Sequence, residues 1–252
     1  MLSIVKAEYL KYRRTFARKL VIIAPLFFVL LALPQSLFMP PEYVHSWNLI
    51  LTLVYNWWPV LFIPLGLALL ASLVENQERR AGNYCALRIH SFSSALLWVG
   101  KILVLAGHLL ATSLGLMSIA VISGFLTGAG PIPWKQILAG GLVLWFTSLP
   151  LVPLQLWISH RFGMIINMLV GFLGLGGGVV AAAQPYWIYV PWSWCTRLMS
   201  PIIGVHPNGT FLAEADPLLN PQVIPVGLAL AFASFLILTL LTSSFFKARE
   251  VR

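Results

Sequence analysis

The sequence predicts an all-α polytopic membrane protein, with six transmembrane helices in a single domain over residues 1–252. The first observation is composition. Hydrophobic residues make up 59% of the chain and charged residues 9%, whereas a soluble domain is about one quarter charged. The second is length, because apolar runs recur that match the roughly 20 residues needed to cross about 30 Å of hydrocarbon. A chain so poor in charge cannot cover itself with polar groups, so most of its surface must face lipid.

Residues 1–19 predict an amphipathic helix lying on the membrane surface. Apolar side chains from Leu2 to Phe16 recur at alternating spacings of three and four, which places them on one helical stripe. Basic residues occupy much of the remaining surface: Lys6, Lys11, Arg13, Arg14 and Arg18. This pattern favours a helix in the headgroup region, with its cations near lipid phosphates. A short solvated helix that only sets the orientation of the chain is the alternative.

Six apolar runs within residues 20–246 are predicted to span the membrane, before a cytoplasmic tail of residues 247–252. They are Leu20–Met39, Leu49–Val74, Ala95–Thr127, Gln136–Ile158, Met164–Ala183 and Val223–Phe246. The third is longer than a bilayer is thick, so it should tilt or project beyond the membrane. Kinks are predicted at the prolines of the first, second and fourth runs, which are Pro25, Pro34, Pro59, Pro64, Pro150 and Pro153.

The positions of the basic residues predict the orientation. Of the 16 lysines and arginines, all but Lys135 and Arg197 fall in the two tails, in the connections after the second and fourth runs, or just inside the third run. Positive residues favour the cytoplasmic side of a membrane. We therefore expect a multi-pass protein of the cell membrane with both termini in the cytoplasm. These cations form no continuous patch for a nucleic acid, so nucleic-acid binding is not expected.

Residues 184–222 form the longest predicted outer connection, and its first part is aromatic but interrupted by prolines. Trp and Tyr concentrate at the boundary between membrane and water. The segment either re-enters the outer leaflet as short helices or forms a plain aromatic belt at the end of the fifth span. Both interpretations satisfy the same distribution of aromatic residues.

Motifs for catalysis are missing from the chain. It has no phosphate-binding G-x-x-x-x-G-K-[ST] loop and no G-x-S-x-G nucleophile elbow. The glycine-rich stretch Gly174–Gly178 lies inside a predicted span and lacks the lysine, so it favours close helix packing. Gly124 and Gly128 form a G-x-x-x-G pair with the same interpretation. His108 is the histidine well inside an apolar run, where a packing or hydrogen-bonding role is favoured over catalysis.

No pair of histidines or carboxylates has the spacing of metal ligands. The acidic residues all lie in tails, connections or span ends, which counts against ion-coupled transport because such transporters place carboxylates within their spans. We therefore expect a chain that is not an enzyme and holds no cofactor or metal of its own. Energy for any transport would have to come from another protein.

The richest polar segment, Glu75–Tyr84, closes the second predicted span and continues through the apolar residues Leu87, Ile89, Phe92, Leu96 and Leu97. A short amphipathic helix here could insert into a groove on a soluble partner. A solvated loop whose arginines only fix the topology is the alternative, and the pattern alone does not separate the two.

At this segment the chain resembles export-class (type-2) ABC permeases, and among them the lantibiotic immunity, or self-protection, permeases. The features that carry the resemblance are the basic N-terminal helix, the six spans in about 250 residues, and four short motifs. The motifs are Trp57-Trp58-Pro59 with Pro64-Leu65, Glu75 to Gly82, Trp98-Val99-Gly100-Lys101, and Pro191-Trp192-Ser193. The likeness covers essentially the whole chain.

The resemblance implies two permease chains, identical or related, that sit over two ATPase subunits holding ATP and Mg. The segment after the second span would be the coupling helix that docks on the ATPase, with the site residues Glu75, Glu78, Arg79, Arg80 and Gly82. The connection between spans five and six would carry re-entrant outer helices. The cargo would be a cationic amphiphilic antimicrobial peptide such as a lantibiotic. Trp192 and Trp194 are possible cargo contacts, because indoles suit an interfacial amphiphile.

Three alternatives remain open from the sequence. The chain could be the permease of another ABC exporter, for a drug, a lipid or a different peptide. It could be a membrane sensor or scaffold that moves nothing and has no ATPase partner. An intramembrane enzyme is the third, which the missing catalytic constellations disfavour.

Overall fold

The structure is a computed structural model that describes residues 1–13, 15–38, 47–82, 93–127 and 130–250, without the side chains of residues 31–38, 127 and 248–250. The described chain is helical and contains no β-strand, only an isolated bridge between Val205 and Phe211. Its α-helices are α1 (Leu2–Lys11), α2 (Phe16–Phe38), α4 (Trp47–Trp57), α5 (Ile63–Arg80), α7 (Ser94–Thr127), α8 (Trp134–Ser148), α9 (Leu151–Phe162), α10 (Met164–Ala182), α11 (Pro191–Ile203) and α12 (Val223–Glu250). Shorter helical turns are η1 (Trp58–Phe62), η2 (Pro185–Tyr189) and η3 (Pro217–Leu219).

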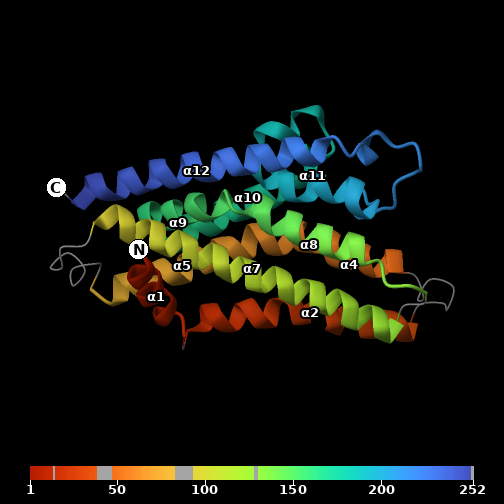
Figure 1. The fold of residues 1–252 in the computed structure, drawn as a ribbon, viewed down its shortest axis with the longest axis horizontal. Helices are drawn as coiled ribbons and strands as arrows, with labels where there is room; N and C mark the ends of the chain where they lie inside the picture. Colours follow the sequence, from red (N-terminus) through yellow and green to blue (C-terminus); the bar gives the residue numbers. More distant parts are fainter. Residues whose placement is uncertain (14, 39–46, 83–92, 128–129, 251–252) are drawn as a thin grey trace.

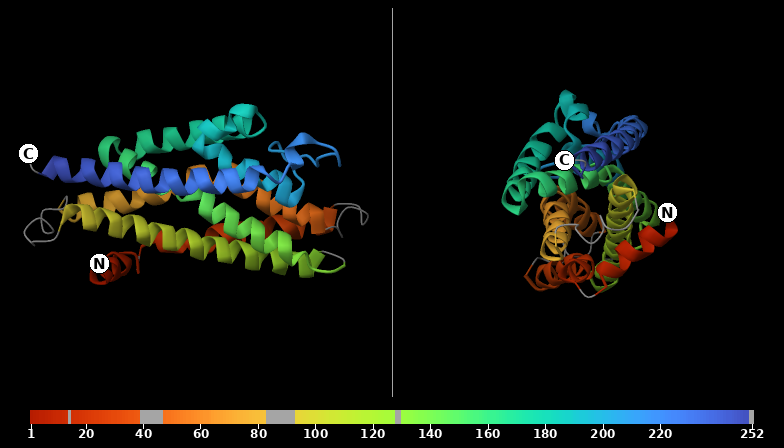
Figure 2. Two further views of the ribbon diagram at one scale, coloured as in Figure 1. Left: turned by 45° about the horizontal axis from the view of Figure 1, so that its top comes forward. Right: turned by 90° about the vertical axis from the view of Figure 1, so that its left-hand side faces the viewer.

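The long helices lie side by side along the longest axis of the molecule and form one elongated bundle (Figure 1). Both chain termini lie toward the same end of this bundle (Figures 1 and 2). The short helix α1 lies at that end, on the outside of the bundle, where it contacts α7. The opposite end carries α11, η3 and the start of α4 (Figure 1).

Within the described residues, five helical stretches are long and apolar enough to cross a membrane. They are Trp47–Arg80, Ser94–Leu126, Trp134–Phe162, Met164–Ala182 and Val223–Lys247. These correspond to the second to sixth predicted spans. The first predicted span coincides with α2, which packs along α7. The long apolar helices confirm the prediction of an all-α multi-pass membrane protein.

Two boundaries differ from the sequence prediction. The second span does not end near Val74, because α5 continues to Arg80. Residues 1–19, predicted as one interfacial helix, are divided between two helices: α1 ends at Lys11 and α2 already begins at Phe16. Arg18 therefore lies in the first turn of α2, and Arg14 falls outside the described residues.

Prolines interrupt two of the spans. The second span passes through a π-helical turn, η1, that contains Pro59. The fourth span is divided between α8 and α9, with Pro150 at the junction. Proline has no backbone N–H, so it removes one hydrogen bond of the helix and opens the turn before it. In contrast, α2 continues through Pro25 and Pro34 without a break.

Glycines allow α10 to approach its neighbours closely. A Cβ built on Gly171 would lie 2.9 Å from the backbone oxygen of Pro64 in α5, and one on Gly178 would lie 3.0 Å from the backbone oxygen of Trp192 in α11. Gly174 faces the indole of Trp192 in the same way. Within the glycine-rich stretch, Gly174 and Gly178 therefore serve close helix packing, whereas a Cβ on Gly176 or Gly177 meets nothing within 4 Å. Gly124 likewise packs against Trp47, while Gly128 lies outside the described residues.

The predicted outer connection, residues 184–222, folds into η2, α11 and η3. Helix α11 packs against α10, α8 and α4. Trp194 is 3% exposed, and its indole nitrogen donates to the backbone oxygen of Ile188 at 3.2 Å. Trp192 is half-buried against the glycines of α10. Both indoles therefore pack within the protein, and the side chain of Trp194 is closed to a cargo in this arrangement.

Replacing Tyr55 with phenylalanine is expected to lower the free energy of unfolding by about 1 kcal/mol. Tyr55 is fully buried, and its hydroxyl donates to the backbone oxygen of Ile137 at 2.8 Å, which ties α4 to α8. The change removes only this hydrogen bond. Unfolding of the purified protein in detergent, followed by tryptophan fluorescence, measures the difference. Tyr189→Phe is the matched control, because Tyr189 is 79% exposed; an equal loss in both variants would contradict the expectation.

Candidate coupling site

The polar end of α5 is buried in the protein. Glu75 is 1% exposed and Glu78 is 6% exposed, although both lie in the last two turns of the helix. A buried carboxylate is strongly destabilising unless cations or hydrogen-bond donors surround it. The neighbouring elements supply such partners, and this explains why the helix continues past Val74.

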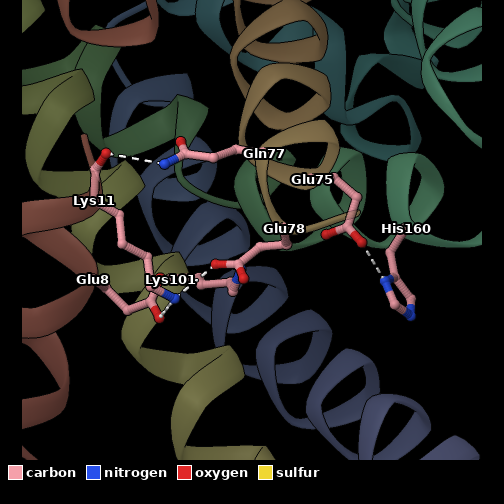
Figure 3. A network of polar contacts seen from close by, with 7 residues as sticks. All are labelled: Glu8, Lys11, Glu75, Gln77, Glu78, Lys101 and His160. Carbon is pink, nitrogen blue, oxygen red and sulfur yellow. Dashed lines mark hydrogen bonds and ion pairs between the residues drawn. The ribbon is translucent and has the colours of Figure 1, made fainter. Parts of the chain in front are cut away.

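Glu78 is the centre of an ionic cluster formed by Glu8, Lys11, Glu78 and Lys101 (Figure 3). Its Oε1 lies 2.7 Å from Nζ of Lys11 and 2.7 Å from Nζ of Lys101. Lys11 also lies 2.6 Å from Oε1 of Glu8. Lys101 is fully buried and Glu8 is 2% exposed. The two lysines balance the two carboxylates, so the ionic cluster joins α1, α5 and α7 without a net charge.

A further hydrogen bond fixes α1 against α5. The side-chain amide of Gln77 donates to the backbone oxygen of Lys11 at 3.1 Å (Figure 3). Burial alone lowers the pKa of Lys11, but its hydrogen bonds to Glu78 and Glu8 outweigh that effect and raise the pKa above 10.5. While Glu78 and Glu8 are ionised, Lys11 therefore contributes fully to stability below pH 10.5, and its contribution is lost as the pH rises through the raised value.

The other side of α5 is fixed to α9. Oε1 of Glu75 lies 2.6 Å from Nδ1 of His160, whose ring packs edge-on against the stacked rings of Trp98 and Phe246. About one helical turn after Glu75, Nη2 of Arg79 donates to the backbone oxygens of Ser159 and His160 at 3.1 and 2.8 Å. These oxygens belong to the last turn of α9, where a cation is favourable. The end of α5 is therefore joined by ion pairs and hydrogen bonds to α1, α7 and α9.

The last residues of this segment are exposed. Arg79, Arg80, Ala81 and Gly82 lie open on the surface after the buried carboxylates. Gly82 has φ of 97°, a left-handed conformation that ends the helix and that other residues rarely adopt. The predicted continuation through Leu87, Ile89 and Phe92 lies outside the described residues. The described part thus has a buried inner half, Glu75 and Glu78, and an exposed outer half, Arg79 to Gly82.

Sequence reasoning found one partner of this site and missed two. The basic face predicted for residues 1–19 includes Lys11, which pairs with Glu78. Lys101 was predicted only as a positive residue near the cytoplasm, and His160 was given no role. The signal for Lys101 was its place inside an apolar run, where a charge requires a partner.

His108 has the packing role that the sequence favours. It is 7% exposed, its Nδ1 lies 2.8 Å from the backbone oxygen of Val104, and its ring packs in a tilted arrangement against that of Tyr12, with 4.8 Å between the ring centroids. Among the described residues, no three histidines, cysteines or carboxylates come together as a metal ion would require.

Comparison with protein families matches this part of the chain. A family model described as ABC-2 family transporter protein covers residues 4–174, which include α1, the whole ionic cluster, Glu75 and His160. Searches of curated proteins and of solved structures found no significant match. Proteins of this family are the membrane components of ABC transporters and are not themselves ATPases. Because the match extends over more than half of the chain, the protein belongs to the ABC-2 transporter family, as a multi-pass permease that works with separate ABC ATPase subunits.

Proposed function

We propose that this chain is the permease of an ABC exporter that removes a cationic amphiphilic antimicrobial peptide, such as a lantibiotic, from the cell membrane. Two permeases, identical or related, would sit over two ATPase subunits that hold ATP and Mg. In this proposal α2 is the first of six spans, both termini are cytoplasmic, and η2 and α11 are re-entrant helices of the outer leaflet. The family supports the permease, and the resemblance described above supports the peptide cargo.

The observation that carries the proposal is the division of the coupling segment. Its outer half, Arg79 to Gly82, is exposed and available to an ATPase. Its inner half, Glu75 and Glu78, is buried and ion-paired to α1, α7 and α9. A force on the outer half would reach the spans through these buried pairs. A solvated loop that only fixes topology would have no need of them.

Transport then requires two packings of the spans whose free energies differ by a few kcal/mol. Nucleotide binding must stabilise one of these packings more than the other. Closure of the ATPase subunits on ATP would shift the end of α5, and the ionic cluster would carry that shift to α1 and α7.

An apolar hollow of about 270 Å³ between α2, α5 and α7, lined by Phe27, Trp58 and Phe62, could receive an apolar side chain of the cargo. The resemblance rather than any contact in the structure supports outward transport.

Reversal of the exposed charge at Arg80 tests the coupling role. In membrane vesicles that contain the permease and its ATPase, Arg80→Glu is expected to reduce ATP-dependent movement of a dye-labelled cationic amphiphilic peptide by about tenfold, because a reversed charge opposes a complementary surface. Stability should not change, since Arg80 lies outside the ionic cluster. Lys135→Glu is the matched control, an exposed charge reversal on α8 at the other end of the bundle.

Two outcomes would contradict parts of the proposal. Wild-type transport by Arg80→Glu would mean that this segment does not contact the ATPase. An active ATPase with no peptide movement in wild-type vesicles would exclude the peptide cargo. The remaining interpretation would then be another ABC exporter, which the same vesicles can test with lipids and drugs.

A further inference from the structure

A second feature of α1 lies on the helical face beside the ionic cluster. Glu8 and Lys11 face α5 and α7, whereas Lys6 and Tyr9 border a hollow of about 750 Å³ between α1, α2 and α7. This volume is within the range of about 300–1,000 Å³ found for small-molecule sites. The hollow lies outside the coupling segment and shares no residue with it.

The hollow is lined mainly by apolar residues, and two cations also line it. The apolar residues come from all three helices: Leu2, Val5, Val21, Ile22, Leu103, Val104 and Ala111. Lys6 and Arg18 supply positive charge from α1 and α2, at the end of the bundle that bears the chain termini. Within the described part of the chain, neither of them forms an ion pair with a carboxylate. Arg18 makes one long hydrogen bond, 3.4 Å, to the backbone oxygen of Arg13.

Two cations in the lining of an otherwise apolar hollow complement a molecule with an anionic head and an apolar chain. Basic pockets between transmembrane helices near the cytoplasmic surface bind anionic lipid headgroups, and the inner leaflet is rich in such lipids. A soluble anion would leave the apolar walls exposed, and a zwitterionic lipid would offer the cations no net charge. The combination of charge and apolar surface therefore selects an anionic phospholipid.

We propose that this hollow binds one anionic phospholipid of the inner leaflet, with its phosphate between Lys6 and Arg18 and an acyl chain between α2 and α7. A bound lipid would hold α1 against α7 and so keep Lys11 in the ionic cluster. The site goes beyond the proposed transport function and does not depend on an ATPase or on a cargo. The lipid-binding test can therefore fail while the transport proposal stands, and the transport proposal can fail while the lipid-binding test succeeds.

The experiment uses the purified full-length chain in a neutral detergent, titrated with phosphatidylglycerol or with phosphatidylcholine of the same acyl chains. Native mass spectrometry counts bound lipid, and the unfolding midpoint reports stabilisation. Wild type is expected to bind one phosphatidylglycerol in preference to phosphatidylcholine. Lys6→Gln and Arg18→Gln should each weaken this binding by about fivefold, and the double variant by about thirtyfold. Lys19→Gln is the matched control, because Lys19 is exposed and does not line the hollow.

Gly107→Leu provides a steric test that leaves both cations in place. Gly107 lines the hollow, and a Cβ built on it meets nothing within 4 Å, so a larger side chain would enter the open space. Leucine also favours a helix more than glycine does, so the variant should fold. We expect phosphatidylglycerol binding to fall at least about tenfold, because the acyl chain and the leucine would compete for the same volume.

Five results would overturn the proposal. Four of them are equal binding of the two lipids, unchanged binding by the Lys6 and Arg18 variants, full binding by Gly107→Leu, and equal stabilisation by inorganic phosphate. The fifth is a wild-type dimer that is lost in Lys6→Gln and Arg18→Gln, since a second copy of the chain would then occupy this surface.

Discussion

Replacing Glu78 with glutamine is expected to lower the free energy of unfolding by about 3–5 kcal/mol, the usual consequence of removing one member of a buried ion pair. Glu78 is the carboxylate that Lys11 and Lys101 share, at 2.7 Å from each. Lys101 is fully buried and would lose this compensating charge. Equilibrium unfolding in detergent measures the loss, and ATP-dependent transport should fall with it because α1 and α7 are no longer tied to α5.

Two controls separate this effect from a general sensitivity of the segment. Arg80→Gln changes an exposed residue two positions away and is expected to alter stability by less than about 0.5 kcal/mol. The double variant Glu78→Gln with Lys101→Met removes both members of the buried pair and should recover part of the loss. Equal stability of Glu78→Gln and Arg80→Gln would show that the ionic cluster does not hold α5 in place.

The second large effect is expected at Gly171, where alanine should lower the free energy of unfolding by about 1–3 kcal/mol through overpacking. The added Cβ would lie 2.9 Å from the backbone oxygen of Pro64 and from Cβ of Ala68, and backbone atoms cannot turn aside as a side-chain end can. Helices α5 and α10 would have to separate. Because α5 carries the coupling segment, the change should also reduce transport.

Gly176→Ala is the matched control on the same helix. A Cβ at Gly176 meets nothing within 4 Å, so the same substitution creates no clash there. Alanine is a better helix former than glycine by about 1 kcal/mol, so this variant is expected to be neutral or slightly stabilising. A similar loss of stability in both variants would show that glycine serves something other than close packing at position 171.

The spans and their packing glycines could be predicted because lipid imposes a simple requirement. Apolar runs such as Ala95–Thr127 must be helical in hydrocarbon, where every backbone polar group needs an internal partner. The missing backbone N–H of proline explains the breaks near Pro59 and Pro150, whereas α2 continues through Pro25 and Pro34. Neither requirement explains why α5 continues to Arg80, since that end depends on side chains from other helices.

The coupling segment was visible as a polar stretch, but its internal division was not. Glu78 lies 67 residues from Lys11 along the chain, and their contact arises only when α1 folds back onto α5. Position in a sequence does not reveal such a pairing. The same limit applies to Trp194, whose aromatic character fits both an interfacial cargo contact and the buried packing observed.

The most direct test of the central claim is to isolate the tagged chain from native membranes in mild detergent, identify the proteins that accompany it, and assay ATP hydrolysis. The account predicts an ABC ATPase in stoichiometric amount, with vanadate-sensitive hydrolysis that Arg80→Glu weakens and Lys135→Glu does not. A chain that is repeatedly recovered intact, alone and without ATPase activity would contradict the account, and would favour a membrane sensor or scaffold.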